Sequence, residues 1–414
     1  MLHRASGILI FIQILTLGPL QGQTACDPAS FGAKADGTTK DTAAIQGAID
    51  SCANAGGGTV RLSTGVYLSA PLTLKSNVTL DIGAGVRLLA SSDAADYASS
   101  AGAPLLPLVG ASQQTDIAIT GQGTIDGAGA PWWAAVLAAR QAGQPDPARP
   151  HLIDFVSCQR VNVQGVTLAN SPGAHLVPTG SDTVVISGVT IQAPPDSPDT
   201  DGIDPSNSRN ITISNCAIDT GGDNIAIQSA TVDPNHPGAG SENISIADCS
   251  FLHCRGLSIG TATIGGVRSV QVQRCSFKGT DNGLRIQSDR GEGGEVSQIS
   301  YSDITMDSVG AAIVFTGYYP TIPDTDSPQP VTALTPFYHD IKITNLNATG
   351  GSSSGVIVGL PETPLSGIIF NQVNISADSA LVVRNASVLT TSTTVPFILQ
   401  GGALVGVYFD PAGI

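Results

Sequence analysis

An eight-residue pattern, seen in Val161-Asn-Val-Gln-Gly-Val-Thr-Leu168, decides the fold. Two apolar residues two positions apart are followed by a turn residue and then by a second apolar pair with the same spacing. Seven further copies occupy residues 184–191, 211–218, 244–251, 270–277, 299–306, 341–348 and 368–375. Successive copies start 23, 27, 33, 26, 29, 42 and 27 residues apart.

Each copy predicts short strands joined by a tight turn. Residues two apart on a strand point to the same side, so the alternation gives every copy one apolar face. The central Gly, Asn or Asp suits a turn with positive φ. One coil cannot bury its own apolar face, whereas stacked coils can. The sequence therefore predicts an all-β chain, a single-domain right-handed parallel β-helix, the hand being that of parallel crossovers.

Two segments outside the repeats carry their own predictions. Residues 41–52 have a helical pattern, with Asp41 or Thr42 near the N-cap. This short helix would cap the N-terminal end of the solenoid, where strand edges are otherwise exposed. Residues 317–336 are rich in Pro, Thr and Asp and predict a loop on one face. We expect residues 23–414 to form one domain.

The composition agrees with a repetitive β structure. Of 414 residues, 51 are charged (18 Lys and Arg with 33 Asp and Glu), while 48 are Gly. Hydrophobic residues reach 41%, which excludes a disordered chain. Charged residues are too scarce for the solvated faces of a coiled coil or helical repeat. The net charge of −15 argues against a nucleic-acid partner.

Residues 1–22 have the parts of a signal peptide. His3 and Arg4 form a short charged start, residues 7–20 are apolar, and small residues follow. A retained anchor helix and a lipid-modified Cys26 are the alternatives. We expect a secreted protein, extracellular or periplasmic, that contacts no membrane after signal cleavage.

The seven cysteines gain meaning from export, because an oxidising compartment permits disulfides. Cys26 and Cys52 flank one N-terminal segment and are the preferred pair. The remaining cysteines lie in the repeats, where Cys more often packs as a small hydrophobe. They are Cys158, Cys216, Cys249, Cys254 and Cys275. The odd count leaves at least one thiol unpaired.

A second register through the coils gathers polar side chains. The inward apolar positions are Ile203, Ile225, Leu257, Leu284 and Ile313. Two positions earlier stand Asp201, Asp223, Arg255 and Asn282, and one position later stand Asp204, Ala226, Ser258 and Arg285. Coils stack about 4.8 Å apart. Asp201 and Asp223 should therefore be neighbours, with Arg255 next and Arg285 one coil further.

Two carboxylates beside two guanidinium groups can perform acid/base chemistry on an anionic sugar. The alternative is a structural polar ladder at the solenoid turns. Residues 251–290 hold six of the 18 basic residues against two acidic ones, Asp281 and Asp289. Such a basic island can hold a carboxylate-bearing substrate. Its alternative is a scatter of solvated surface charges.

Four segments, in this order, resemble the motifs of the polygalacturonases, glycoside hydrolase family 28. They are residues 197–204, 221–227, 254–260 and 285–287, where the family reads NTDG, GDDxIAI, GHGxSIG and RIK. The similarity covers nearly the whole chain after the signal peptide. It implies hydrolysis of α-1,4-galacturonosyl bonds in pectin with inversion, without a metal or other cofactor.

The resemblance also implies roles for single residues. Asp201 and Asp223 would be catalytic and activate water, Arg285 would bind a substrate carboxylate, and Tyr319 would contact substrate. The expected partner is a pectin-like or polygalacturonate-like polysaccharide, bound by a monomer.

Four positions depart from the family's motifs. Gly222 stands where the family has its general-acid Asp, and Asp199 stands where it has Asn. Arg255 replaces the motif His and Gln287 replaces the motif Lys. We expect Arg255 and Gln287 to bind substrate as altered groups, and Asp199 to be a supporting carboxylate.

The missing acid leaves several hypotheses open. In one, Asp223 would serve as acid with Asp201 or Asp199 as base, since neighbouring like charges raise the pKa of one carboxyl. In the other, the substrate is changed to a different uronide or a rhamnogalacturonan link, because Arg255 and Gln287 alter the binding groups. We predict a secreted glycoside hydrolase acting on pectin-type polysaccharide. The alternatives are a catalytically impaired β-helix that binds acidic polysaccharide and a calcium-requiring enzyme like the pectate lyases.

Overall fold

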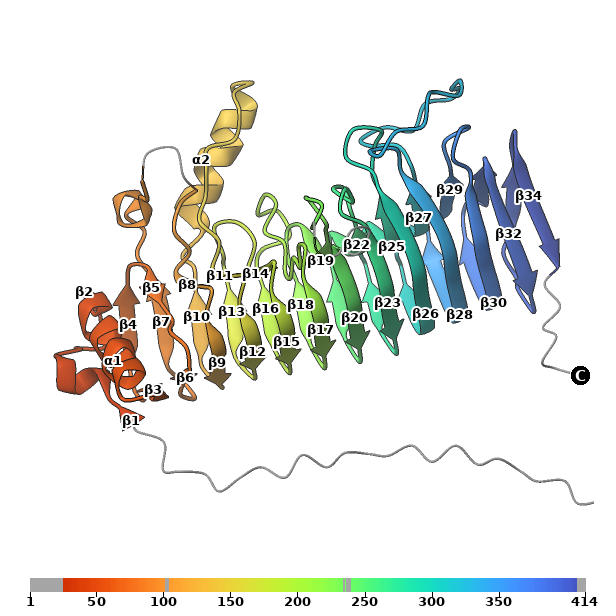
Figure 1. The fold of residues 1–414 in the computed structure, drawn as a ribbon. Helices are drawn as coiled ribbons and strands as arrows, with labels where there is room; N and C mark the ends of the chain where they lie inside the picture. Colours follow the sequence, from red (N-terminus) through yellow and green to blue (C-terminus); the bar gives the residue numbers. More distant parts are fainter. Residues whose placement is uncertain (1–24, 101–103, 234, 236–239, 408–414) are drawn as a thin grey trace, which may run out of the picture.

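Parallel strands stack coil upon coil along one axis and are the main secondary structure of the chain (Figure 1). The computed structural model describes residues 25–100, 104–233, 235 and 240–407, so the predicted signal peptide lies outside the described residues. The strands fall into parallel sheets of 23, four and seven strands. The predicted all-β parallel β-helix is confirmed.

The 23-stranded sheet contains β1 (Ala25–Cys26), β2 (Asp36–Lys40), β3 (Gly58–Leu62), β4 (Val66–Ser69), β6 (Val78–Ile82), β7 (Arg87–Ala90), β9 (Thr115–Gly121), β10 (Thr124–Asp126), β12 (Gln159–Gln164), β13 (Thr167–Ala169), β15 (Asp182–Ser187), β16 (Thr190–Gln192), β17 (Arg209–Ser214), β18 (Ala217–Asp219), β20 (Ser241–Ala247), β21 (Ser250–Leu252), β23 (Val267–Gln273), β24 (Ser276–Lys278), β26 (Glu295–Asp307), β28 (Phe337–Gly351), β30 (Leu365–Ala377), β32 (Ala386–Thr391) and β34 (Ala403–Val407). The four-stranded sheet contains β5 (Leu72–Thr73), β8 (Val109–Ser112), β11 (Ile153–Val156) and β14 (Leu176–Thr179). The seven-stranded sheet contains β19 (Asp223–Ile227), β22 (Arg255–Ile259), β25 (Asn282–Gln287), β27 (Ala311–Thr316), β29 (Ser353–Val358), β31 (Leu381–Arg384) and β33 (Phe397–Leu399). The helices are α1 (Thr42–Asn54), α2 (Ala130–Gln141) and the 3-10 turns η1 (Pro28–Phe31) and η2 (Ala94–Tyr97).

The eight-residue repeats lie in the 23-stranded sheet and pair in the predicted register. Val161 of β12 lies beside Val184 of β15, and Ile186 of β15 lies beside Ile213 of β17. The central turn residue of every copy has positive φ: Gly165, Gly188, Asn215, Asp248, Arg274, Asp303, Asn345 and Gln372. Arg and Gln occupy this conformation in two coils, so the stacking of neighbouring coils imposes the turn even where the residue type does not favour it.

The predicted inward column is confirmed, and all of its members are fully buried: Ile203, Ile225, Leu257, Leu284 and Ile313. Isolated bridges join Leu176 of β14 to Ile203, and Ile203 to Ile225 of β19. Through these bridges the four-stranded and seven-stranded sheets form one continuous face of the solenoid. The two columns that flank Ile203 and Ile225 therefore lie on that one face.

Helix α1 lies at the N-terminal end of the solenoid, as predicted (Figure 1). Its buried residues are Ala44, Ile45, Ala48, Ile49 and Cys52. Asp41 precedes the helix but makes no side-chain cap hydrogen bond within it. Its carboxylate instead accepts the backbone N–H groups of Lys34 at 2.6 Å and Ala35 at 2.9 Å, which ties the preceding turn to the start of the helix.

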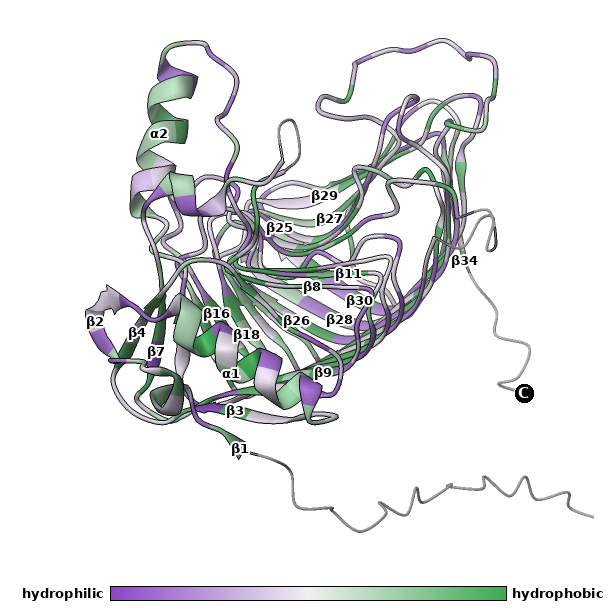
Figure 2. Ribbon diagram, turned by 60° about the vertical axis from the view of Figure 1, so that its left-hand side comes forward, coloured by the Kyte–Doolittle hydropathy of each residue, from purple (hydrophilic) through white to green (hydrophobic). Residues whose placement is uncertain are grey.

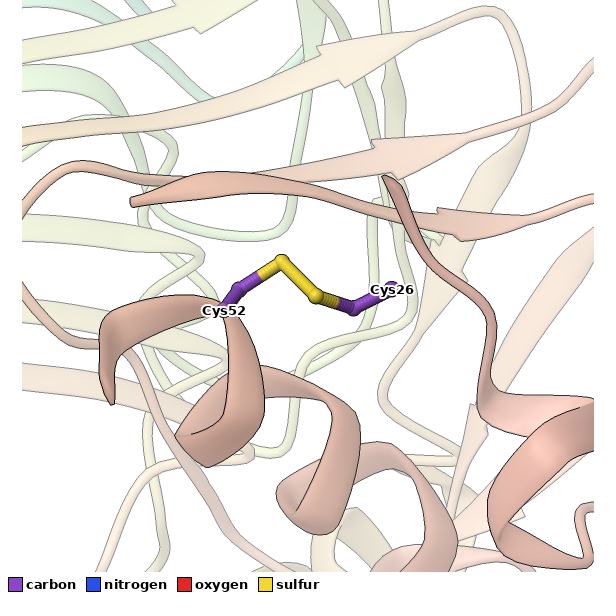
Figure 3. Close-up of a disulfide and its surroundings, with 2 residues drawn as sticks. All are labelled: Cys26 and Cys52. Carbon is purple, nitrogen blue, oxygen red and sulfur yellow. A yellow bond between two sulfur atoms is a disulfide. The ribbon is translucent and has the colours of Figure 1, made fainter. Parts of the chain in front are cut away.

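The preferred cysteine pair is confirmed, since Cys26 and Cys52 form a disulfide between β1 and α1 (Figure 3). A thiol in a disulfide cannot carry a lipid, so the alternative of a lipid-modified Cys26 is inconsistent with this structure. Four of the other cysteines are buried and Cys254 is partly exposed, all of them as free thiols.

Helix α2 was not predicted, because its Ala-rich sequence carries no repeat signal and lies between two strands of one coil. It is anchored at its start: the rings of Trp132 and Tyr97 lie 5.7 Å apart, and Trp133 Nε1 donates to the carbonyl of Ser171 at 3.0 Å. Residues 317–336 form the predicted loop between β27 and β28. Helix α2 and this loop project from the same side of the solenoid (Figures 1 and 2).

Candidate active site

Adjacent parallel coils bring the predicted polar columns together on one face. Asp223 of β19 pairs in register with Arg255 of β22, and Ser258 of β22 pairs with Arg285 of β25. The preceding coil joins through the bridge between Ile203 and Ile225, which places Asp201 one coil before Asp223. The neighbour relations expected from counting are therefore confirmed.

The carboxylate of Asp223 is surrounded by donors. Arg285 Nη2 donates to both of its oxygens, at 2.9 and 3.0 Å. Ser258 Oγ donates to Oδ1 at 2.6 Å, and Arg255 Nε donates to Oδ2 at 3.1 Å. Arg285 Nε also donates to Ser258 Oγ at 2.9 Å, so the hydroxyl links the two ions. Two guanidinium groups and a hydroxyl thus contact this one carboxylate through charge-assisted hydrogen bonds.

The carboxyl of Asp201 has a different environment. Its Oδ1 accepts the backbone N–H of Asp223 at 2.6 Å, whereas the nearest approach of Arg255 is 4.0 Å. Burial, followed by the negative charge of Asp223, raises the pKa of Asp201 to about 6. Two neighbouring carboxyls thus lie in different surroundings, Asp223 among cationic donors and Asp201 further from them, which is the condition for dividing acid and base roles.

His175 fixes the backbone at Asp201 from the preceding coil. It is fully buried, its Nδ1 lies 2.9 Å from the carbonyl oxygen of Asp201, and the N–H of Ser171 donates to its Nε2 at 3.3 Å. Nε2 therefore accepts and Nδ1 donates, which is the pattern of a neutral imidazole. Burial lowers the pKa of His175 to about 4.

Asp204 is a third carboxyl of the site that the sequence analysis placed in a column but did not select. Its side chain is buried, and burial followed by the charges of Asp201 and Asp223 raises its pKa well above the usual range. The signal for Asp204 in the sequence was its position, because it places a carboxyl in the same outward column as Ser258 and Arg285. Ser258 was passed over in the same way, although it contacts Asp223 directly.

Gly222 leaves room that the carboxyl of Asp201 fills. A Cβ atom built at Gly222 would lie 2.0 Å from Asp201 Oδ1 and 3.0 Å from the backbone nitrogen of Asp201. In this chain Asp201 therefore occupies the space next to residue 222, and any side chain there would displace it.

Asp199 lies at the edge of the site and is exposed. Arg140, from the end of α2, donates to its carboxylate, Arg255 Nη2 lies 3.7 Å away, and Arg149 Nη2 lies 4.0 Å away. Arg149 also donates to the carbonyl oxygens of Pro172 and Pro198. These contacts hold the segment after α2 against the coil that carries Asp201.

The remaining predicted site residues lie further along the face. Gln287 is buried at the end of β25 and, in the described part of the chain, makes no hydrogen bond to Asp201 or Asp223. Tyr319 is 47% exposed in the 317–336 loop and is close enough to Arg285 for an electrostatic interaction. Its position agrees with a substrate-contacting role, which remains a prediction, as does that of Gln287.

The predicted basic island does not form one surface. Arg268, Arg274 and Lys278 belong to β23, β24 and their turn in the 23-stranded sheet, where they pair with Glu242, Asp248 and Asp307. The seven-stranded sheet itself contributes Arg255 and Arg285, and both pair with Asp223. Residues close in sequence separate because successive strands of a coil belong to different sheets.

Two negative findings concern the described residues. Across residues 25–100, 104–233, 235 and 240–407, no group of three or more His, Cys, Asp or Glu side chains is arranged to hold a metal ion. Within those same ranges, no helix is long and apolar enough to cross a membrane.

Comparison with known proteins places this geometry in context. A model of the glycosyl hydrolases family 28 matches residues 52–393. An endo-polygalacturonase of Pectobacterium carotovorum subsp. carotovorum is 32% identical over 379 residues, which cover 86% of this chain and 89% of that protein. A solved polygalacturonase from Erwinia carotovora ssp. carotovora is 29% identical, with a TM-score of 0.69 over 94% of this chain and 98% of that one. A family 28 exopolygalacturonase of Yersinia enterocolitica shares the fold, with a TM-score of 0.79 at 22% identity over 94% of this chain and 79% of that one.

Proposed function

The chain belongs to the glycosyl hydrolases family 28, and on that premise we propose that it hydrolyses galacturonosyl bonds in pectin-type polysaccharide. The observation that carries the proposal is the contrast between two neighbouring carboxyls. Asp223 accepts from two guanidinium groups and a hydroxyl, whereas Asp201 is partly buried, with 21% of its side chain exposed, and has a pKa of about 6. Glycoside hydrolysis needs one carboxyl that can give a proton and one that can take a proton.

The two environments suggest how the roles divide. Asp223, stabilised as an anion, would take a proton from water as the water attacks the anomeric carbon. Asp201, protonated below about pH 6, would give its proton to the leaving oxygen as the glycosidic bond breaks. These roles are the reverse of the hypothesis in which Asp223 is the acid. Asp201 would supply the proton that the family's carboxyl at the position of Gly222 would otherwise give.

The guanidinium groups of the site would also recognise the substrate. Each guanidinium has five N–H donors, more than Arg255 and Arg285 use on Asp223 and Ser258. Their remaining donors fit the carboxylate of a galacturonate unit. Tyr319 on the neighbouring loop and Gln287 on β25 would complete a binding surface on the same face.

A second candidate function follows from Gly222, which leaves the site without the family's general acid. In that case the chain would be a catalytically impaired β-helix that binds acidic polysaccharide through Arg255 and Arg285. An eliminating enzyme similar to pectate lyases is a third candidate with weaker support, because the motifs are not those of that family.

The deciding experiment incubates the purified protein with polygalacturonate and with other pectic glycans, with and without a chelator. New reducing ends without ultraviolet-absorbing product are expected, and the size of the products separates endo from exo action. The Asp223→Asn variant should lose this activity. The Asp248→Asn variant, which removes an exposed carboxylate from the other sheet, is the matched control.

The other outcomes favour the alternatives. Binding to the glycans without any product across substrates and pH would overturn both enzymatic proposals. A chelator-sensitive unsaturated product would replace hydrolysis by elimination.

Export is also part of the proposal. We propose that residues 1–22 direct the chain out of the cytoplasm and are removed, leaving residues 23–414 as one monomeric domain. The Cys26–Cys52 disulfide supports export, because such bonds persist in oxidising compartments. N-terminal sequencing of the mature protein tests the cleavage, and light scattering tests the monomer.

A further inference from the structure

Asp204 follows the proposed acid, Asp201, on the same segment of the chain. Among the described residues, no basic side chain forms an ion pair with it. It occupies the outward column that continues through Ala226 and Ser258 to Arg285, on the same face as the site. Only 9% of the residue is exposed. Its Oδ1 is buried and has no hydrogen-bond partner among the described residues. Its carboxyl lies close enough to that of Asp201 for a hydrogen bond to form when one of the two is protonated.

The surrounding charges make an anion at Asp204 unfavourable. Asp201 lies on the same segment and Asp223 lies on β19, so both near acids repel a further negative charge. The cations of the site, Arg255 on β22 and Arg285 on β25, direct their short hydrogen bonds to Asp223. His175, on the preceding coil, contacts the backbone carbonyl oxygen of Asp201, and the imidazole of His175 is neutral.

A buried carboxylate with an unpaired oxygen is strongly unfavourable, and taking up a proton removes this cost. Contact between two carboxyls requires a proton between them, because two anionic oxygens cannot hydrogen bond to each other. The pair therefore holds a proton, and Asp204, the more buried partner, is the one that keeps it. The backbone N–H of Ala226 favours the anion of Asp204, but its effect is smaller than those of burial, Asp201 and Asp223. A protonated carboxyl is a hydrogen-bond donor.

We propose that Asp204 is a positioning residue that stays protonated and donates a hydrogen bond to the carboxyl of Asp201. The inference rests on the proposed function. When Asp201 gives its proton to the leaving oxygen, the glycosidic C–O bond breaks, water adds its hydroxyl to the anomeric carbon, and the other water proton passes to Asp223. The O–H of Asp204 and the N–H of Asp223 then stabilise the new charge on Asp201 without moving. The proton on Asp223 leaves to solvent and Asp201 is reprotonated from solvent, which restores the site.

Two substitutions separate this role from packing. Asp204→Asn keeps the shape and an N–H donor, so kcat and the alkaline limb of its pH profile should stay close to those of the wild type. Asp204→Ala removes the donor, so kcat should fall by about 10- to 100-fold with little change in KM. Without that hydrogen bond Asp201 should hold its proton more tightly, which moves the alkaline limb to higher pH.

Two outcomes overturn the proposal. If the Asn variant moves the alkaline limb to lower pH, Asp204 carried a negative charge in the wild type. If the Ala variant leaves the limb in place, Asp204 does not act on Asp201. Circular dichroism and thermal unfolding of each variant verify that it is folded, and Asp248→Asn is the control for general surface effects.

A readout without activity separates failure of this inference from failure of the proposed function. Infrared difference spectra of the folded protein near pH 7.5 should contain the C=O band of a protonated carboxyl, and Asp204→Asn should remove it. Absence of that band in the wild type overturns the inference whether or not the protein hydrolyses pectin. Its presence in a protein without hydrolytic activity would leave Asp204 protonated and would reject the enzyme.

Discussion

Both carboxylate oxygens of Asp223 accept a hydrogen bond from a single nitrogen of Arg285, Nη2, at 2.9 and 3.0 Å. The two side chains are nearly buried, with 11% and 12% of their surface exposed. Removing Arg285 leaves the nearly buried carboxylate of Asp223 with Arg255 Nε and Ser258 Oγ as its remaining side-chain donors, and losing one member of a buried pair costs more than the pair contributes in net stability. The pair therefore links the stability of the sheet to the ionised state of the proposed base.

The first prediction follows from that link. Arg285→Ala should lower the free energy of unfolding by about 3–5 kcal/mol, measured by urea denaturation. The control is Arg274→Ala, whose side chain is 49% exposed in a pair with Asp248, and which should cost about 1 kcal/mol or less. Equal small losses in both variants would contradict a buried ion pair.

The second prediction concerns the space beside Gly222. Gly222→Ala should lower kcat, because the added methyl group meets Asp201 Oδ1 and pushes that carboxyl from its position. The expected loss is about 10²-fold or more if Asp201 is the general acid. At Gly401 an added methyl group meets nothing within 4 Å, so Gly401→Ala is the control and should leave kcat unchanged.

The companion substitution is Gly222→Asp, which introduces a carboxyl at the position where the resemblance to the family's motif predicts the general acid. It should not raise activity, since the new side chain competes with Asp201 for the same space. A large gain in polygalacturonase activity would mean that Asp201 can move aside and is not the acid in this chain.

The third prediction is a pH dependence set by Asp201. A general acid must be protonated, so kcat should fall as the pH rises through about 6, the pKa to which burial and then Asp223 raise this carboxyl from 3.8. Because folding raises the pKa of Asp201, this carboxyl also stabilises the folded state at pH values below its unfolded-state pKa. That contribution to the free energy of unfolding is lost as the pH rises through about 6. The measurement is kcat at saturating polygalacturonate across pH. An activity that continues to increase above pH 7 would contradict the assignment.

The fourth prediction concerns the loop that carries Tyr319. Arg384 of β31 donates to the carbonyl oxygens of Pro323 at 2.7 Å and Asp324 at 2.8 Å, and its guanidinium lies 5.9 Å from the ring centre of Tyr318. Arg384→Ala should speed proteolytic cleavage between residues 317 and 336. KM should rise more than kcat falls, because Tyr319 would be held less firmly beside the site.

The control for the loop is Arg160→Ala, which removes an exposed ion pair with Asp116 between β12 and β9 of the 23-stranded sheet. Unchanged cleavage and KM in Arg384→Ala would mean that the loop is held by its other contacts alone. Those contacts include the hydrogen bond from Tyr318 Oη to Asp326 at 2.9 Å.

The fifth prediction tests the N-terminal cap. Cys26 and Cys52 are separated by 26 residues, and a cross-link of that span limits the unfolded chain. Cys52→Ser should lower the free energy of unfolding by about 2–4 kcal/mol. Cys254→Ser, at a partly exposed free thiol, is the control. The wild type under reducing conditions should reproduce the loss, and an unchanged denaturation midpoint would contradict it.

Much of the fold and part of the site could be predicted from the sequence, because stacked parallel coils pair in register. Counting from the buried Ile225 and Leu257 was enough to place Asp223 beside Arg255. The same count placed Asp204 on the outward face, but it carried no information on burial. Asp204 was therefore not recognised as part of the site.

The sequence by itself determined the solenoid, its N-terminal helix and the rows in which the site residues stand, since a period of two residues and in-register stacking leave little freedom. Only the tertiary structure decided which side chains meet within those rows. Arg140 reaches Asp199 from a helix 59 residues earlier, and the carboxyl of Asp201 fills the space beside Gly222. The course of the long connections and the rotamers of the side chains depend on the space between neighbouring coils. The periodicity of the sequence contains no information about that space.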